Sequence, residues 1–246
     1  MKEGRRMKRI NKFMAEAGIC SRREADQLIQ TKSVTINGEV ATLGSMVGPT
    51  DLVKVNRKEV GHIEEKMIFA FYKPRGVTCT AKDKFAKKTV MEYMKTPVRV
   101  TYAGRLDQDS EGLLLMTNDG DLIQTLMKGA NGHEKEYIVK VKQKITDVFL
   151  QKMTQGIYIK DLKQSTRPCK IEKIGDYTFN IILTQGLNRQ IRRMCQELSY
   201  EVVSLKRIRV NTVSLGNQKI GTLRKLDKKE CKQLYQSVRM NSPKEF

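Results

Sequence analysis

The chain has 246 residues, which is long enough for one large domain or two unequal ones that bury a core without disulfide or metal cross-links. It carries 47 lysines and arginines against 27 aspartates and glutamates, a formal net charge of +20, and 39% of its residues are hydrophobic. This composition excludes a disordered tail, a collagen-like chain and a disulfide scaffold. The positive charge predicts a polyanionic partner, most commonly nucleic acid, because neutralised phosphates release condensed counterions.

The sequence contains neither a membrane anchor nor a metal-binding pattern. No stretch approaches the roughly eighteen apolar residues that a spanning helix needs, and the basic N-terminus lacks the apolar core of a signal peptide. We therefore expect a cytoplasmic protein that does not bind membranes. The five cysteines are scattered and never spaced as Cys-x-x-Cys. With only His62 and His133 to add, they form no zinc pattern, so we expect buried thiols and no bound metal.

The sequence pattern in the first part of the chain predicts two helices and a few short strands. Apolar residues recur at helical spacing from Ile10 to Ala17, and Gly18 ends this helix. Ser21 and Glu24 have the spacing of a capping box, which predicts that a second helix opens there. Asn37-Gly38 is typical of a two-residue hairpin turn, because both of its residues tolerate a positive φ.

Two arginines occupy an unusual place in the second predicted helix. Arg22 and Arg23 lie in its first turn, where the helix dipole disfavours cations. Free N–H groups beside two arginines would suit a phosphate, although the pair can equally extend into solvent. The segment from Lys8 to Val40 resembles the alpha-L RNA-binding module of a small-subunit ribosomal protein and several RNA-modifying enzymes. This resemblance implies that Lys12, Arg22 and Arg23 face an RNA backbone.

A short strand over residues 52–55 ends this first unit. From Asn56 to Lys66 the charges are mixed and no period is visible, which is typical of a linker. We expect an RNA-binding domain over residues 7–60, a linker over 61–66 and a second, larger domain over 67–240. His62 falls in the linker and is expected to be solvated.

The larger domain predicts an α+β fold with a mixed, largely antiparallel sheet and flanking helices, because strands and helices mix without regular βαβ alternation. No glycine-rich phosphate loop is present, so no nucleotide cofactor is indicated. Strands are predicted over 67–72, near 98–100, and over 113–116, 135–142 and 177–184, and helices over 120–128, 145–156 and 187–198.

One acidic loop in this domain is a candidate for chemistry. Asp107 follows Arg105 in a glycine-bounded loop that runs into an apolar strand. A carboxylate held there can be catalytic or can be an ordinary turn residue. Asp109 and Glu111 are competing candidates, and spacing alone does not choose among the three.

A family resemblance does choose among them. The segment GRLDQDSEGLLLMTNDGDL, which begins at Gly104, resembles the catalytic motif of the RsuA/RluB/RluE/RluF family of pseudouridine synthases. KPRGV, EKEYIVKV and QGLNRQIRRMC resemble the family's other motifs and occur in the same order, from residues 73, 134 and 185. The segment NGHEKEY, from residue 131, together with QGLNRQIRRMC is most similar to the RluF type, which modifies a hairpin of large-subunit (23S) ribosomal RNA.

The resemblance implies an enzyme that isomerises uridine to pseudouridine in such a hairpin. The reaction changes no redox state, so neither a cofactor nor a metal is required. Small-subunit rRNA or a tRNA remains an alternative substrate, and a non-enzymatic RNA-binding assembly factor is an alternative function. We expect a monomer.

Site residues also follow from the resemblance. Asp107 is the catalytic carboxylate, which must be ionised and is favoured in that form by a nearby cation. Arg192 aligns with that cation, although it can also be a solvated helix-face arginine. Tyr137 aligns with a tyrosine that stacks on the extruded uracil, although it can also be a core aromatic, and Arg105 would hold the base out of its stack. Further RNA contacts are implied for Leu106, Gln108, Leu187, Asn188, Arg189 and Gln190.

Overall fold

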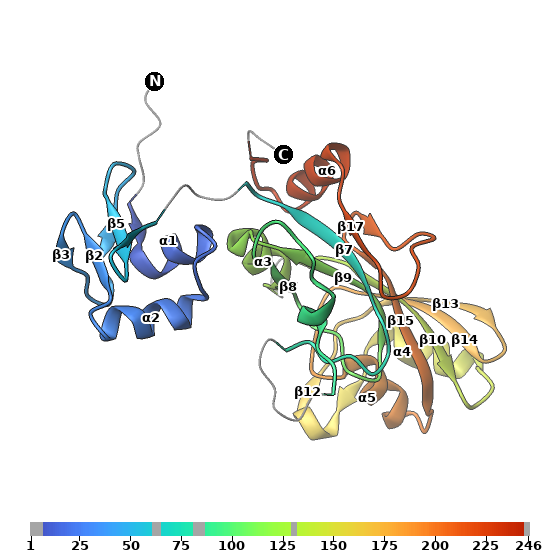
Figure 1. Cartoon of the computed structure of the whole chain (residues 1–246). Helices are drawn as coiled ribbons and strands as arrows, with labels where there is room; N and C mark the ends of the chain where they lie inside the picture. The colour runs from blue at the N-terminus through green and yellow to red at the C-terminus, as the bar shows by residue number, and fades with distance from the viewer. Residues whose placement is uncertain (1–6, 61–64, 81–86, 129–131, 244–246) are drawn as a thin grey trace. The chain divides into compact units, whose positions relative to one another are not determined.

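The computed structural model describes residues 7–60, 65–80, 87–128 and 132–243. The chain divides into two compact units, residues 1–66 and residues 67–246, here called the N-terminal and C-terminal units (Figure 1). No helix among the described residues is both long and apolar enough to cross a membrane.

The N-terminal unit packs two helices on a four-stranded antiparallel sheet with the order β3-β2-β5-β6, and β1 pairs separately with β4. The predicted capping box is confirmed: the Ser21 hydroxyl accepts from the Glu24 N–H, and the Ser21 N–H donates to the Glu24 carboxylate. The predicted hairpin turn is also confirmed, with φ of 52° at Asn37 and 91° at Gly38. The elements are β1 (Lys8–Arg9), α1 (Ile10–Glu16), α2 (Arg22–Gln30), β2 (Val34–Ile36), β3 (Glu39–Val40), β4 (Met46–Val47), β5 (Val53–Val55) and β6 (Lys58–Glu59).

The expected aperiodic stretch after the fifth strand is partly structured. Asn56 and Arg57 form a turn with positive φ at both residues, β6 follows it, and Val60 is buried in the core of the unit. A two-residue strand is too short for its alternation to be recognised, which is why the sequence pattern suggested a linker here. Gly61 and His62 lie outside the described residues.

The C-terminal unit is built on a nine-stranded sheet with the order β13-β14-β10-β15-β9-β7-β17, with β16 paired to β15 and β8 paired to β9. Among the described strands only β9 and β15 pair in parallel, so the expected α+β fold with a largely antiparallel sheet is confirmed. The elements are β7 (Ile68–Lys73), η1 (Val90–Tyr93), β8 (Thr101–Ala103), β9 (Glu111–Thr117), α3 (Gly120–Met127), β10 (Lys135–Val141), α4 (Asp147–Gln155), β11 (Tyr158–Ile159), η3 (Lys160–Leu162), β12 (Gln164–Ser165), β13 (Lys170–Gly175), β14 (Thr178–Leu183), α5 (Gln190–Glu197), β15 (Val202–Val210), β16 (Val213–Ser214), β17 (Leu223–Lys225) and α6 (Lys228–Ser237).

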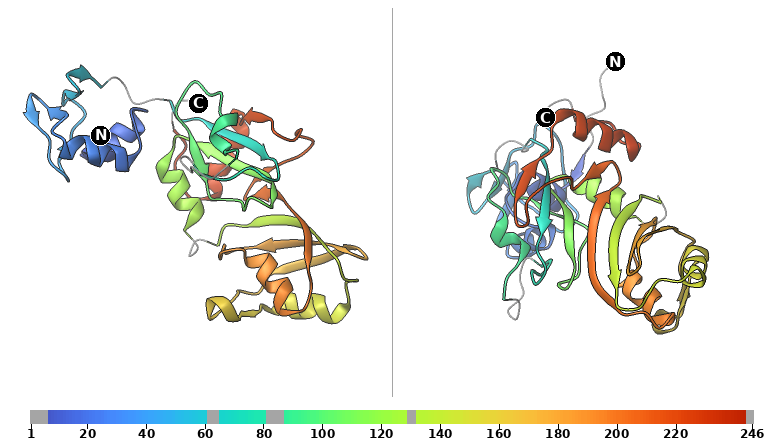
Figure 2. Two further views of the ribbon diagram at one scale, coloured as in Figure 1. Left: turned by 60° about the horizontal axis from the view of Figure 1, so that its bottom comes forward. Right: turned by 90° about the vertical axis from the view of Figure 1, so that its right-hand side faces the viewer.

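The strands β7 and β9 are buried on both faces, which explains their continuous apolar sequences. Ile68, Ala70 and Tyr72 point into a cluster shared with α3 and α6, whereas Phe69 and Phe71 point into a second cluster on the opposite face. A third cluster lies under α4 and α5 at the other half of the sheet. Figures 1 and 2 show α6 near β7 and β17, and α4 and α5 at the opposite end.

Several predicted elements shift by a few residues. The strand expected near residues 98–100 begins at Thr101 as β8, and Val100 instead places its side chain in the core. The helix expected from Leu187 begins at Gln190, because Arg189 before it adopts the left-handed conformation with φ of 50°. All five cysteines are buried, as expected.

Candidate active site

The loop between β8 and β9, residues 104–110, is held by backbone contacts on the side of the KPRG turn. The Gly76 N–H donates to the Gln108 carbonyl at 2.7 Å, and the Gln108 side chain donates back to the Gly76 carbonyl at 3.2 Å. The Leu106 N–H donates to the Cys79 thiol at 3.4 Å. These bonds fix the backbone on both sides of Asp107.

A buried lysine fixes the end of the same loop. Lys73 is fully buried, and its Nζ donates at 2.8 Å to the Ser110 carbonyl and to that of the residue after Lys73. Burial lowers the pKa of Lys73 to about 8, against the opposing effects of Cys79, Asp107 and Asp109. The last residue of the loop is therefore held by a hydrogen bond from the buried Lys73 ammonium group.

The glycine after the loop allows two strands to approach closely. Gly112 has φ of +113°, and a Cβ there would lie 2.2 Å from the Arg207 carbonyl oxygen. This contact forms the parallel pairing of β9 with β15. Tyr137 on β10 is in turn the register partner of Arg207 on β15. The row Tyr137, Arg207 and Gly112 thus runs across the sheet to the end of the acidic loop.

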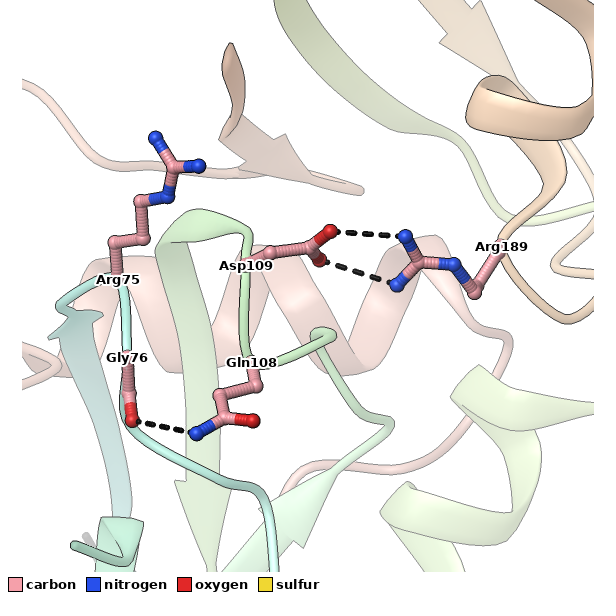
Figure 3. Close-up of a pocket in the computed structure, with 5 residues that line it drawn as sticks. All are labelled: Arg75, Gly76, Gln108, Asp109 and Arg189. Atoms are coloured by element: carbon pink, nitrogen blue, oxygen red, sulfur yellow. Dashed lines mark hydrogen bonds and ion pairs between the residues drawn. The ribbon is translucent and has the colours of Figure 1, made fainter. Parts of the chain in front are cut away.

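A pocket of about 390 Å³ opens beside this loop, lined by Arg75, Gly76, Gln108, Asp109 and Arg189 (Figure 3). The guanidinium of Arg189 donates to both carboxylate oxygens of Asp109, at 3.2 and 2.8 Å. The exposed Arg75 guanidinium makes no hydrogen bond or ion pair with any residue that the structure describes. The pocket thus combines one neutralised and one uncompensated arginine.

Asp107 lies next to this pocket. Its carboxylate is 37% exposed, and its Oδ2 is 3.7 Å from Nη1 of Arg189. Arg189 therefore contacts both acids of the loop, although it makes hydrogen bonds only with Asp109. A partly exposed carboxylate on a fixed loop beside a guanidinium can attack or deprotonate a bound group.

Arg192 is not ion-paired with Asp107, which corrects the expected pairing. Its side chain is 14% exposed, and its Nε is 3.3 Å from Oδ2 of Asp109. Its Nη2 donates to the Asp109 carbonyl at 3.1 Å and contacts the Ser110 hydroxyl, while Nη1 donates to the Val202 carbonyl. Asp109, and not Asp107, is the ion-pair partner of Arg192, because the Asp109 side chain turns toward the start of α5, where Arg189 and Arg192 lie.

The pKa of Asp109 reflects these two arginines. Burial alone would raise it, but the Arg189 hydrogen bond and the charges of Arg192 and Arg189 hold the pKa below its ordinary value. From the sequence alone, Asp109 is only an alternative to Asp107 as the catalytic acid. The signal in the sequence for the pairing of Asp109 with Arg189 and Arg192 is the cluster of arginines at the start of α5.

Tyr137 and Arg105 occupy different environments. Tyr137 is half-buried and contacts both the cluster under α4 and α5 and the cluster that contains Leu106, so part of its ring belongs to the core. Arg105 is exposed and makes no hydrogen bond or ion pair within the described part of the chain.

Two residues expected to touch RNA have buried side chains instead. Leu106 is 6% exposed and packs in the core, where it anchors the loop. Gln190 is 5% exposed, and its side chain accepts from the Leu187 N–H at 3.0 Å, which closes the turn before α5. Leu187 is half-buried against the core, whereas Asn188 is exposed.

The candidate RNA contacts of the N-terminal unit lie on its helices. Arg22 and Arg23 are exposed in the first turn of α2, as the sequence predicts. Lys12 on α1 is half-buried, and its Nζ is 3.7 Å from the Glu16 carboxylate.

Sequence comparison identifies both units. A family profile described as RNA pseudouridylate synthase matches residues 67–197, and one described as S4 domain matches residues 8–60. The dual-specificity RNA pseudouridine synthase RluF of Escherichia coli (strain K12) is 42% identical over 236 residues, which is 95% of this chain and 80% of that protein. The ribosomal large subunit pseudouridine synthase B of Bacillus subtilis (strain 168) is 37% identical over 234 residues, 93% of this chain and 96% of that protein.

Structural comparison agrees. A crystal structure described as that of a pseudouridylate synthase matches with a TM-score of 0.68 at 29% identity and covers 92% of this chain and 99% of that one. The chain therefore belongs to the RNA pseudouridine synthases of the RsuA/RluB/RluF type, isomerases that carry an N-terminal S4 domain for RNA binding.

Proposed function

We propose that Asp107 is the catalytic carboxylate with which this pseudouridine synthase converts one uridine in a hairpin of 23S ribosomal RNA. The observation that carries this proposal is the position of Asp107, partly exposed on a loop fixed from two sides and next to an arginine-lined pocket. Asp109 is bound to Arg189 on both oxygens and is therefore less available to a substrate.

The reaction breaks the bond from N1 of uracil to C1′ of the ribose and forms a bond from C5 to C1′. C5 loses its proton, and N1 ends with one, so mass and oxidation state do not change. Asp107 either attacks the sugar or the base, or removes a sugar proton to give a glycal-like intermediate. Each route needs a carboxylate, and Arg189 places a guanidinium nitrogen 3.7 Å from that of Asp107.

The target base must leave its helix to reach Asp107. Tyr137 offers a half-buried ring for stacking, and the exposed Arg105 has no partner among the described residues that would hold it elsewhere. Exposed side chains line the pocket at Arg75, Gln108 and Arg189 and would contact the flanking RNA. Asn188, which is exposed and precedes Arg189 in the chain, would do the same. Arg192 would support the site through Asp109 and the loop backbone.

The assignment to large-subunit rRNA rests on the relatives. The Bacillus subtilis relative is named for the ribosomal large subunit, and the Escherichia coli relative is named as dual-specificity. We assign the chain a 23S rRNA hairpin as its main substrate and the cytoplasm, where ribosomes assemble, as its place of action, with the chain acting as a monomer. Lys12, Arg22 and Arg23 of the S4 domain would hold the RNA backbone. Residues 7–60 would act as the RNA-binding domain and residues 67–240 as the catalytic domain.

Tritium release from rRNA labelled at uracil C5 tests the reaction, because C5 loses its hydrogen in every route. Carbodiimide-based primer extension on RNA from a deletion strain then locates the target. Loss of one 23S signal supports the proposal, and loss of a small-subunit or tRNA signal instead changes the substrate. If no signal is lost and no tritium is released, the protein acts as an RNA-binding assembly factor.

A further inference from the structure

The N-terminal unit contains a basic pocket that is separate from its candidate RNA-binding helix face. The pocket has a volume of about 420 Å³. Three of its lining residues are cations, and the other three carry polar side chains that can donate hydrogen bonds. The lining residues are Lys32, Ser33, Thr35, Lys54, Asn56 and Arg57.

The register of the small sheet places this pocket on the face turned away from the helices. Val34 pairs with Val55, and both are buried against α1 and α2. Thr35 pairs with Lys54 in the next position, and neither residue belongs to that core. Because successive side chains of a strand point to opposite faces, Thr35 and Lys54 point away from the helices.

The cations of this pocket have no ion-pair partner among the residues that the structure describes. Lys32, Lys54 and Arg57 form no ion pair with any carboxylate of the described residues, although Glu59 stands opposite Lys54 across β5 and β6. In contrast, Lys8 on β1 is ion-paired with Glu16 on α1 at 2.6 Å. Within the described part of this unit, the pocket therefore gathers three cations without an ion-paired carboxylate.

Two of these cations occupy backbone positions that favour glycine. Lys32 follows the end of α2 with φ of 57°, and Arg57 is the second residue of the turn between β5 and β6 with φ of 67°. Glycine is preferred both after a helix end and at the second residue of such a hairpin turn. Local structure alone therefore does not account for a lysine and an arginine here, and strained positions of this kind often serve a function.

We propose that this pocket binds the phosphodiester backbone of RNA. The ligand chemistry follows from three cations with hydroxyl and amide donors around them, which is the donor set that proteins use on phosphate oxygens. Together with Arg22 and Arg23 on α2, the pocket gives the S4 domain a second contact face, on which a different segment of the RNA binds. This inference deepens the proposed function, since it takes RNA as the substrate.

The test replaces the two strained cations by glycine, separately and together, in the full chain. Lys32→Gly and Arg57→Gly each remove a charge while relieving the backbone, so the melting temperature should stay the same or rise. Binding is measured by fluorescence anisotropy on a labelled RNA hairpin whose loop has no uridine, so that the readout does not require pseudouridine formation. Each lost contact should reduce the log–log salt slope by roughly 0.9 on a duplex stem and weaken binding at 0.1 M salt by about 5- to 10-fold.

Matched controls exist elsewhere in the same chain. Lys163 and Arg239 are exposed and also have positive φ, 49° and 57°, so Lys163→Gly and Arg239→Gly remove the same charge from the same backbone conformation. They should leave affinity for the hairpin within about 2-fold, since neither residue lines the pocket and one exposed charge contributes little at this salt.

The proposal is overturned if the pocket variants bind the hairpin with the affinity and salt slope of the controls. It is also overturned if they lose binding only to vesicles that contain phosphatidylserine, since the pocket would then serve a membrane surface. Weakened hairpin binding without any tritium release, even by the unmodified chain, would support the pocket and contradict the proposed catalysis, so the two failures are distinguishable.

Discussion

Asp109 connects the acidic loop to the start of α5, and Asp109→Asn removes its charge with little change in shape. The variant loses the bidentate ion pair with Arg189 and the ion pair with Arg192. Arg192 keeps its hydrogen bonds to backbone carbonyls, so the loop should remain folded. The expected result is a less stable C-terminal unit.

The exposure of each partner sets the size of this effect. Arg189 is 42% exposed, so its pair with Asp109 contributes about 0.5–1 kcal/mol. Arg192 is only 14% exposed, and leaving its charge without a carboxylate costs about 1–3 kcal/mol. The expected loss is thus about 2 kcal/mol, which lowers the melting temperature of a unit of this size by about 4–8 °C.

The sign of the pH dependence follows from the lowered pKa of Asp109. A carboxylate whose pKa is lower in the folded state contributes stability above its ordinary pKa of 3.8, and this contribution is lost as the pH falls through the folded pKa. The difference between the unmodified chain and Asp109→Asn should therefore be full at pH 7 and shrink toward zero as the pH falls below 3.8.

Urea denaturation between pH 7 and pH 3 measures both the size and the sign. Asp161→Asn is the matched control, because it removes another carboxylate paired with an arginine of α5, Arg193, but one that is 66% exposed. It should cost less than about 0.5 kcal/mol. Equal losses for the two variants, or a loss at Asp109 that persists unchanged at pH 3, would refute the role assigned to Asp109.

Three further predictions concern the same unit and its neighbour. The pKa of Lys73 is about 8 in the folded chain and 10.5 in the unfolded chain, so between these pH values only the unfolded chain holds the proton and the free energy of unfolding rises with pH. Lys73→Met should abolish this rise. Urea denaturation of both proteins from pH 8 to pH 10.5 checks the prediction. Gly112→Ala should cost about 3 kcal/mol or more, because its Cβ would meet the Arg207 backbone, whereas Gly38→Ala, with φ of +91° and open space around it, should cost only about 1 kcal/mol; urea midpoints compare the two. Tyr137→Ala should lower kcat/KM of tritium release by about 5- to 150-fold through lost stacking, and Tyr137→Phe, which keeps the ring, should remain near the unmodified value.

Local sequence signals predicted the local structure well. Ser21 and Glu24 form the capping box that their spacing indicates, and Asn37-Gly38 forms the expected turn. Both features depend on a few adjacent residues and need no information from the rest of the chain. The apolar run over residues 67–72 is likewise a buried strand, β7.

Features that depend on distant partners were not accessible in the same way. The strand β15 includes Lys206, Arg207 and Arg209 among its apolar residues, so its alternation is hidden, and Arg207 is nonetheless 2% exposed because its Nε bonds to a carbonyl on β9. The sequence also could not assign the acidic partner of Arg192, since Asp107 and Asp109 are two residues apart and only the direction of each side chain separates them.

The most direct test of the account is the single-turnover rate of Asp107→Asn on rRNA labelled with tritium at uracil C5. Asparagine keeps the size of the side chain but removes the carboxylate, so we expect no detectable tritium release, hairpin affinity within about 2-fold of the unmodified chain, and residual activity in Asp109→Asn. Release at the unmodified rate by Asp107→Asn would contradict the assignment of the chemistry to this residue.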